Sequence, residues 1–200
     1  MLIGNWQFNY SFMKPQGGFT LIELLIVISI IGVLMALGIG SYSHAQKSAR
    51  DAKREAEMKE IMFALTKYYV DHGQYPPAPP SYGENNCSGW DTSNTDGDND
   101  GIFFLDPLVE GGYLDRSYRD PLDARSNSCG GHGATQGHNY FYYRYPAGQY
   151  GCPAARGPYI VLGFGTAESS NGPHPHSEGL TCPNRDWHDT LDFVMHRYEQ

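Results

Sequence analysis

The sequence predicts an α+β fold in which a long N-terminal helix, hydrophobic in its first half, packs on a small antiparallel β-sheet domain. No proline interrupts residues 20–71, and one helix over this range would be about 78 Å long. Leu, Ile and Val are concentrated before residue 40. Runs rich in Tyr, Phe and Ile, bounded by Gly and Pro, follow residue 138 and predict strands.

The first half of the predicted helix, residues 19–40, is an apolar run whose single formal charge is the carboxylate of Glu23. As a helix it would span about 33 Å, which is enough to cross the hydrocarbon core of a bilayer. A carboxylate at the centre of such a helix costs about 2.5–3.5 kcal/mol, so it usually has a partner and a function. An ordinary signal anchor explains the apolar run but leaves Glu23 and the Gly17-Gly18 pair unexplained.

The stretch from Lys14 to Ser41 resembles the type IV prepilins and the type II secretion pseudopilins. These share a short basic leader that ends in Gly, followed by Phe-Thr-Leu-Ile-Glu and a hydrophobic helix. The resemblance implies a pilin-like fold, leader cleavage between Gly18 and Phe19, N-methylation of Phe19, and a role for Glu23 in assembly. The freed α-amine of Phe19 can pair with Glu23 of a neighbouring subunit, which lowers the cost of burying both charges.

With this resemblance, the chain divides into four parts. In chain order they are a prepilin leader (1–18), a transmembrane or filament-core half of the helix (19–40), an amphipathic half (41–72), and a loop-rich soluble β domain (73–200). Within the leader, Met13 to Gly18 alone would be typical of the family, so we expect translation to start at Met13, with Met1 as the alternative.

The position in the membrane follows from the resemblance rather than from the charges. The basic residues after the apolar run would by themselves favour a cytoplasmic C-terminal side, but long domains translocate largely regardless of charge. We therefore expect a single span in the cytoplasmic membrane with the C-terminal domain outside. After assembly, the chain would lie in a periplasmic pseudopilus or a cell-surface filament.

The second half of the predicted helix carries apolar residues at three- and four-residue spacing, which is typical of an amphipathic helix. We expect them to pack one side of the helix on the soluble domain: Ala45, Ala49, Ala52, Ala56, Met58, Met62, Leu65 and Tyr69. Gly73 and the prolines after it end the helix. Strands are expected over residues 139–145, 159–164 and 192–195.

An acidic loop follows the helix, with side-chain oxygens on alternate residues, Asp96, Asp98 and Asp100, and a glycine that allows a tight turn. This spacing suits a hard cation such as Ca²⁺, but the glutamate that closes an EF-hand is replaced by Pro107. Asp106 is the further ligand that we consider, and Asp91 or Glu110 are alternatives. A calcium site and a solvated acidic turn both remain open, and no other cofactor is indicated.

Four cysteines, Cys87, Cys129, Cys152 and Cys182, all follow the membrane segment. An even number in an exported domain implies two disulfides, with three possible connectivities. We expect sequence neighbours to pair, Cys87 with Cys129 and Cys152 with Cys182. A metal site built from these cysteines is the weaker alternative, because none of them forms a close pair in the sequence.

No pattern supports catalysis. His174-Pro175-His176 and nearby His188 hint at a metal site, but such a loop is more often just exposed, and no metalloprotease helix motif or nucleophile elbow is present. The net charge of −8 gives no global basic surface, so no nucleic-acid partner is indicated. We expect a structural protein rather than an enzyme.

Three functions are compatible with these features. We favour a subunit of a type II secretion pseudopilus that drives protein export. The alternative is a subunit of an extracellular type IV pilus for adhesion, motility or DNA uptake. The expected partners of either are other copies of the chain, the prepilin peptidase and a membrane assembly platform. A third hypothesis, a membrane-anchored ligand-binding or enzymatic domain that never polymerises, should tolerate loss of Glu23.

Overall fold

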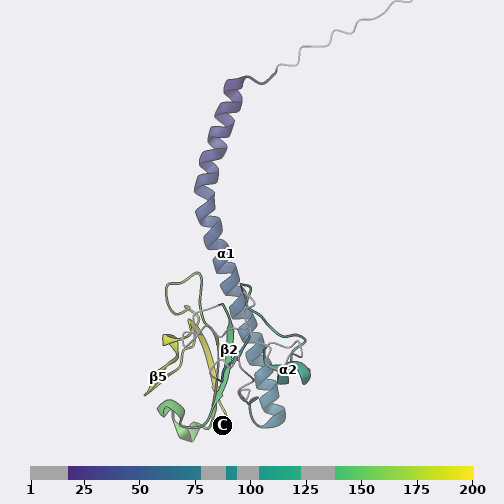
Figure 1. Cartoon of the computed structure of the whole chain (residues 1–200), viewed down its shortest axis with the longest axis vertical. Coiled ribbons are helices and arrows are strands. Elements are labelled where there is room, and N and C mark those ends of the chain that lie inside the picture. Colours follow the sequence, from purple (N-terminus) through teal and green to yellow (C-terminus); the bar gives the residue numbers. More distant parts are fainter. Residues whose placement is uncertain (1–17, 78–88, 94–103, 123–137) are drawn as a thin grey trace, which may run out of the picture. The chain divides into compact units, whose positions relative to one another are not determined.

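The computed structural model describes residues 18–77, 89–93, 104–122 and 138–200. Its elements comprise one long helix, one short helix and six strands, which confirms the predicted α+β class (Figure 1). The chain divides into two compact units, Met1–Ser43 and His44–Gln200. Helix α1 (Leu21–His72) contributes to both of them.

Helix α1 begins and ends where local sequence signals indicate. Thr20 precedes its first residue and bonds to Glu23 within the first turn. At the other end, Gly73 adopts a left-handed conformation with a φ of 70° and donates its N–H to the carbonyl of Tyr69 over 2.8 Å. Glycine suits this position because it has no Cβ to resist a positive φ.

The first unit presents its apolar side chains to its surroundings. Every residue from Gly18 to Ala36 is exposed, among them Leu, Ile and Val side chains that a soluble fold would bury. Within the described residues, α1 is the one helix long and apolar enough to cross a membrane, with a mean hydropathy of 2.7 over its most apolar stretch.

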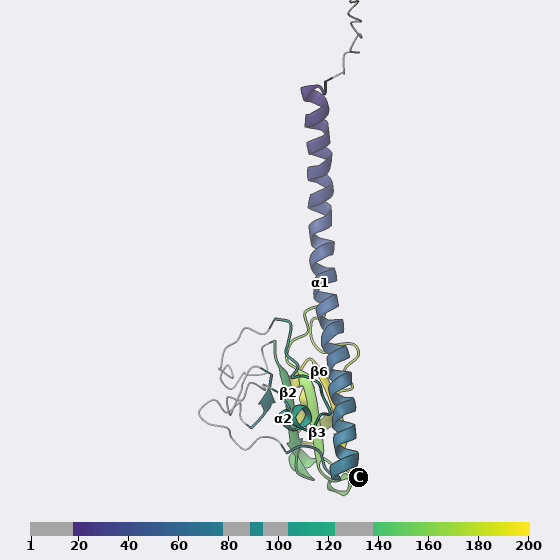
Figure 2. The same cartoon turned by 90° about the vertical axis from the view of Figure 1, so that its right-hand side faces the viewer.

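The second unit is built on an antiparallel sheet of four strands in the order β1-β2-β3-β6 (Figures 1 and 2). Its strands are β1 (Asp91–Thr92), β2 (Tyr140–Tyr145), β3 (Tyr159–Phe164) and β6 (Phe193–Tyr198). The three long strands match the predicted ones. The structure adds β1, a small hairpin of β4 (Thr181–Cys182) and β5 (Arg185–Asp186), and the short helix α2 (Asp106–Glu110).

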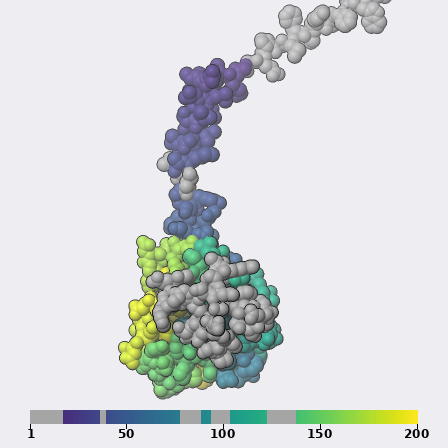
Figure 3. All heavy atoms as spheres, viewed as in Figure 1, coloured from purple at the N-terminus to yellow at the C-terminus, as the bar shows by residue number. Residues whose placement is uncertain are grey.

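The sheet is buried on both faces, so its side chains alternate between two cores. On one face, Tyr140, Ile160 and Phe193 pack in the same cluster as Met58 and Leu65 of α1. The opposite face packs against the C-terminal loops, in a cluster of Phe141, Tyr145, Tyr159, Val161, Val194, Trp187 and Leu191. The atoms of this unit form one packed body (Figure 3). The tyrosines of β2 therefore serve packing.

The expected packing face of α1 was only partly right. Met58, Met62 and Leu65 are buried as predicted, but Ala45, Ala49, Ala52 and Ala56 are all exposed. Their place on the buried side is taken by charged residues: Asp51 and Arg54 lie about two turns and one turn before Met58, and both are almost fully shielded. Sequence periodicity assigned these charges to the solvent side, whereas the domain supplies them with buried ionic partners.

Candidate functional site

The N-terminal turn of α1 carries the predicted assembly residue. One carboxylate oxygen of Glu23 accepts the backbone N–H of Thr20 over 2.9 Å and the Thr20 hydroxyl over 2.8 Å. The Thr20 hydroxyl oxygen in turn accepts the backbone N–H of Glu23 over 3.3 Å. This reciprocal pattern is a capping box, which satisfies two of the helix's free N–H groups.

Thr20 is a residue whose role our sequence reasoning did not identify. The signal was present, because Thr-Leu-Ile-Glu fits the pattern of Ser or Thr followed three residues later by Glu or Gln. A carboxylate in the first turn also interacts favourably with the helix dipole. In a single chain, Glu23 is therefore held at the helix terminus by Thr20, next to the predicted cleavage point.

Gly18 and Phe19, the predicted cleavage residues, lie directly before this turn. Both are exposed, and no described atom outside the adjacent residues comes within 4 Å of the position that a Cβ on Gly18 would occupy. The ring of Phe19 is 81% exposed. The leader before Gly18 lies outside the described residues.

A buried ionic cluster forms the main polar feature of the second unit. Arg54 donates to three carboxylates: to both oxygens of Asp120 (2.7 and 2.9 Å), to Asp51 (2.6 Å) and to Glu168 (2.8 Å). Glu168 also accepts two hydrogen bonds from Arg50. We call these five residues the Arg54 cluster. It joins α1 to two segments that are distant in sequence, around residues 120 and 168.

Asp51 links the same cluster to backbone groups. Its carboxylate accepts the N–H groups of Glu168 and Ser169 and the hydroxyl of Ser169 over 2.6–3.2 Å. The hydroxyl of Tyr140 donates to Glu57, which lies about one turn after Arg54 on α1. Because these polar groups have partners, their burial is tolerated. The arrangement supports a structural role, since it contains no exposed reacting group.

The predicted calcium ligands are only partly described. Asp96, Asp98 and Asp100 lie outside the described residues, and Asp106 begins α2. One oxygen of Asp91 accepts the N–H of Leu105 over 3.0 Å. Burial raises the pKa of Asp91 to about 7, and the charge of Asp106 adds to the rise. These two acids therefore lie near each other, and calcium binding stays a prediction.

One of the two predicted cysteine pairs lies within the described residues and the other lies outside them. The structure joins Cys152 to Cys182, with 5.0 Å between their Cα atoms and a sequence separation of 30. Both cysteines belong to the core on the sheet face away from α1. Cys87 and Cys129 lie outside the described residues.

Comparison with known proteins gives further information on the N-terminal segment. Residues 13–39 match the prokaryotic N-terminal methylation motif. The chain is 37% identical over 81 residues to a fimbrial protein of Neisseria meningitidis serogroup A, covering 40% of this chain and 44% of that protein. It is 38% identical over 73 residues to the type IV major pilin protein PilE1 of Neisseria gonorrhoeae, covering 36% and 40%.

A third relative comes from a secretion system. Type II secretion system core protein G of Pseudomonas aeruginosa is 35% identical over 63 residues, covering 32% of this chain and 44% of that protein. The chain thus spans less than half of the length of these three relatives, and no solved structure matches it. The N-terminal part of the chain therefore carries the prokaryotic N-terminal methylation motif and is similar in sequence to type IV pilins and to a type II secretion core protein.

Proposed function

We propose that this chain is a structural subunit of a helical filament, assembled through the apolar half of α1. The observation that carries the proposal is the first turn of α1. It places a carboxylate, Glu23, at the start of an exposed apolar helix that carries no other formal charge from Phe19 to Gly40. Such a surface is stable in lipid or against copies of itself.

Processing would supply the missing counter-charge. In this proposal the prepilin peptidase cuts between Gly18 and Phe19, and Phe19 is then N-methylated. The new α-amino group of one subunit pairs with Glu23 of the next. Among the described residues, Thr20 donates both hydrogen bonds that the carboxylate accepts, so a positively charged partner adds an ion pair to a site that is already oriented. Each pairing requires an axial stagger between subunits, which favours a head-to-tail array.

The remaining partners and the location follow from this assembly. Before assembly the chain spans the cytoplasmic membrane once, with the second unit outside. A membrane assembly platform extracts it into the filament. Extraction is favourable only if each apolar helix moves from lipid into contact with other apolar helices, because exposure to water would cost about 25 cal/mol per Å² of apolar surface.

Two kinds of filament fit this description. The type II secretion pseudopilus is supported by the similarity to core protein G. The second candidate, an extracellular type IV pilus, is supported by the fimbrial and PilE1 relatives.

The test is the state of the chain in cells that carry the filament machinery. We expect mature protein, recovered from membranes or sheared surface material, to begin with N-methylated Phe19 by mass and N-terminal sequencing. Glu23→Leu should still be cut but should stay in the membrane as unassembled subunits. Glu110→Gln removes an exposed carboxylate outside the apolar half, and it should assemble normally.

Two results would overturn the proposal: an uncut chain as the species present in functioning cells, or filaments of Glu23→Leu in normal amounts. A deletion strain then distinguishes the two filaments. Loss of exported proteins from the medium with surface filaments intact indicates a pseudopilus. Loss of surface filaments with normal export indicates a pilus.

A further inference from the structure

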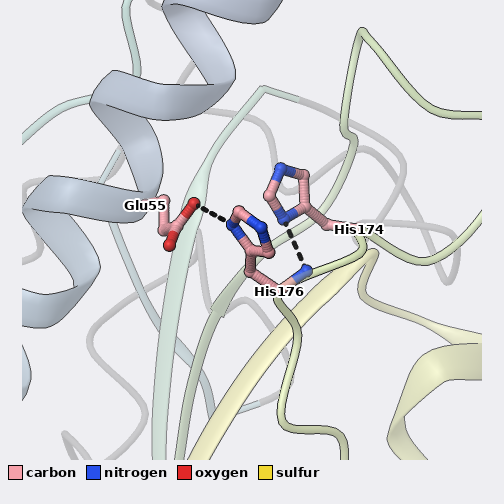
Figure 4. A group of neighbouring side chains, drawn as sticks. All are labelled: Glu55, His174 and His176. Atoms are coloured by element: carbon pink, nitrogen blue, oxygen red, sulfur yellow. Dashed lines mark hydrogen bonds and ion pairs between the residues drawn. The ribbon is translucent and has the colours of Figure 1, made fainter.

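Two histidines and a glutamate meet on the surface of the second unit. Glu55 lies on α1, and His174 and His176 lie in the loop between β3 and β4 (Figure 4). One potential ligand atom from each of the three residues lies within 4.8 Å of those of the other two. His188, the other histidine indicated by the sequence, instead contacts Ser177 over 2.8 Å.

The ring of His174 is held in place by its surroundings. It is buried, and its edge packs against the rings of Phe164 and Phe193, with centroids 6.1 and 5.6 Å away. Its backbone N–H donates to the carbonyl of Asp192 over 2.6 Å. A ligand fixed by packing loses little conformational entropy when it binds an ion.

The hydrogen bond at His174 also selects a tautomer that can bind a metal. Nδ1 of His174 accepts the backbone N–H of His176 over 3.3 Å. A neutral ring in this arrangement carries its proton on Nε2 and keeps a lone pair on Nδ1. The hydrogen bond is long, so an ion can replace it at small cost.

Glu55 and His176 form the open side of the cluster. Nδ1 of His176 and one oxygen of Glu55 are 2.8 Å apart and share a proton, while the other oxygen of Glu55 accepts Lys59 over 2.5 Å. The imidazole of His176 is 67% exposed, so an ion can enter from solvent. Partial burial opposes ionisation of Glu55, but the hydrogen bonds from Lys59 and His176 lower its pKa, so it is charged at neutral pH.

We propose that Glu55, His174 and His176 bind a divalent transition metal ion of the Zn²⁺ type. Two imidazoles and one carboxylate suit Zn²⁺, with a water as the fourth ligand, whereas Ca²⁺ requires six to eight oxygens. The ion takes the place of the proton shared by His176 and Glu55. Bound there, it joins α1 to a loop 121 residues further along the chain and stabilises the folded state by mass action.

The test uses the full chain in detergent, without a polyhistidine tag and under oxidising conditions that keep thiols from binding metal. Calorimetric titration with Zn²⁺ should show one site, and Co²⁺ should give the visible absorption of a site with nitrogen ligands. At a Zn²⁺ concentration one hundred times the dissociation constant, the melting temperature should rise by about 5–10 °C. Millimolar Ca²⁺ should not compete.

Three variants distinguish Zn²⁺ binding at these three residues from nonspecific Zn²⁺ binding to histidines. His176→Ala removes an exposed ligand and should weaken Zn²⁺ binding by at least about tenfold. His44→Ala removes another exposed histidine of α1 and should leave binding unchanged. Lys59→Met removes a positive charge beside Glu55 and should tighten binding. Equal Zn²⁺ affinity in His176→Ala and the unaltered chain, or no binding to either, would overturn the proposal.

Discussion

Arg54 and Asp120 form a doubly hydrogen-bonded ion pair in which both side chains are completely shielded from solvent. Two parallel bonds, Nε to Oδ2 over 2.7 Å and Nη2 to Oδ1 over 2.9 Å, join α1 to a loop 66 residues away. Removing two charges from water is costly, and it is tolerated here because Asp51 and Glu168 accept hydrogen bonds from Nη1 of Arg54, and Nδ1 of His138 lies 3.2 Å from Nη2. The pair therefore fixes how the part of α1 after Ser43 packs within the second unit.

Arg54→Met should destabilise this unit strongly. It leaves the carboxylates of Asp120 and Asp51 buried without their cation, and breaking such a pair costs about 3–5 kcal/mol. Urea unfolding of the full chain in detergent, followed by the fluorescence of buried Trp187, measures the loss. Arg197→Met breaks an exposed pair with Glu178 and should cost less than about 1 kcal/mol. Equal midpoints for the two variants would contradict this interpretation.

Acid should weaken the fold through Glu168. Hydrogen bonds from Arg50, opposed by burial and reinforced by Arg54, lower the pKa of Glu168 to about 2 from a usual value of 4.5. Because the folded pKa lies below the unfolded one, the carboxylate contributes its stability above pH 4.5. That stability is lost as the pH falls toward 2.

The measurement is the melting temperature of the full chain between pH 6 and pH 2. We expect a fall below pH 4.5, and a shallower fall in Glu168→Gln, which starts from lower stability but has no carboxylate to protonate. Glu110→Gln, in an exposed acid of α2, should follow the unaltered chain. Parallel curves for Glu168→Gln and the unaltered chain would show that this residue does not control acid stability.

The disulfide Cys152–Cys182 should stabilise the core on the sheet face away from α1. Closing a loop of 30 residues restricts the unfolded chain, which is worth about 3.6 kcal/mol in the chain-entropy model. The double variant Cys152→Ser and Cys182→Ser should therefore unfold at a clearly lower urea concentration with the other cysteines unchanged. An unchanged urea midpoint would mean that the native state gains nothing from the bond.

Gly163 lies in the middle of β3, where a side chain would not fit. It pairs with Phe141 of β2 and Val194 of β6, and a Cβ at this position would collide with the carbonyl oxygen of Phe193. Gly163→Ala should cost about 1–3 kcal/mol as strands move apart. Gly40→Ala, with no neighbouring atom within 4 Å of its Cβ, should cost nothing. Melting temperatures of both variants test the difference.

Local signals predicted the long elements well. The absence of proline and the cap at Gly73 gave the limits of α1 to within one residue, and the aromatic and β-branched runs gave β2, β3 and the start of β6. The two-residue strands β1, β4 and β5 were not predicted, because so short a segment has no periodicity to detect. Their pairing depends on neighbours that the fold brings together.

The residues of the candidate sites were likewise only partly predictable from the sequence. Glu23 and its place in an apolar helix follow from the sequence, and the capping box with Thr20 was readable from the spacing of the two residues. The contact of Glu55 with His174 and His176 could not be predicted from the sequence, because these residues lie far apart in the chain. The same holds for the Arg54 cluster.

The sequence by itself determined that this chain has a long, mostly apolar first helix with one acid near its start and a compact β domain behind it. These properties depend on residues close together in the chain, whose spacing fixes helix, cap and strand. Only the tertiary structure decided which side of α1 is buried. Periodicity indicated the alanines, but Asp51 and Arg54 are buried instead, because the domain supplies oppositely charged partners from residues 120 and 168.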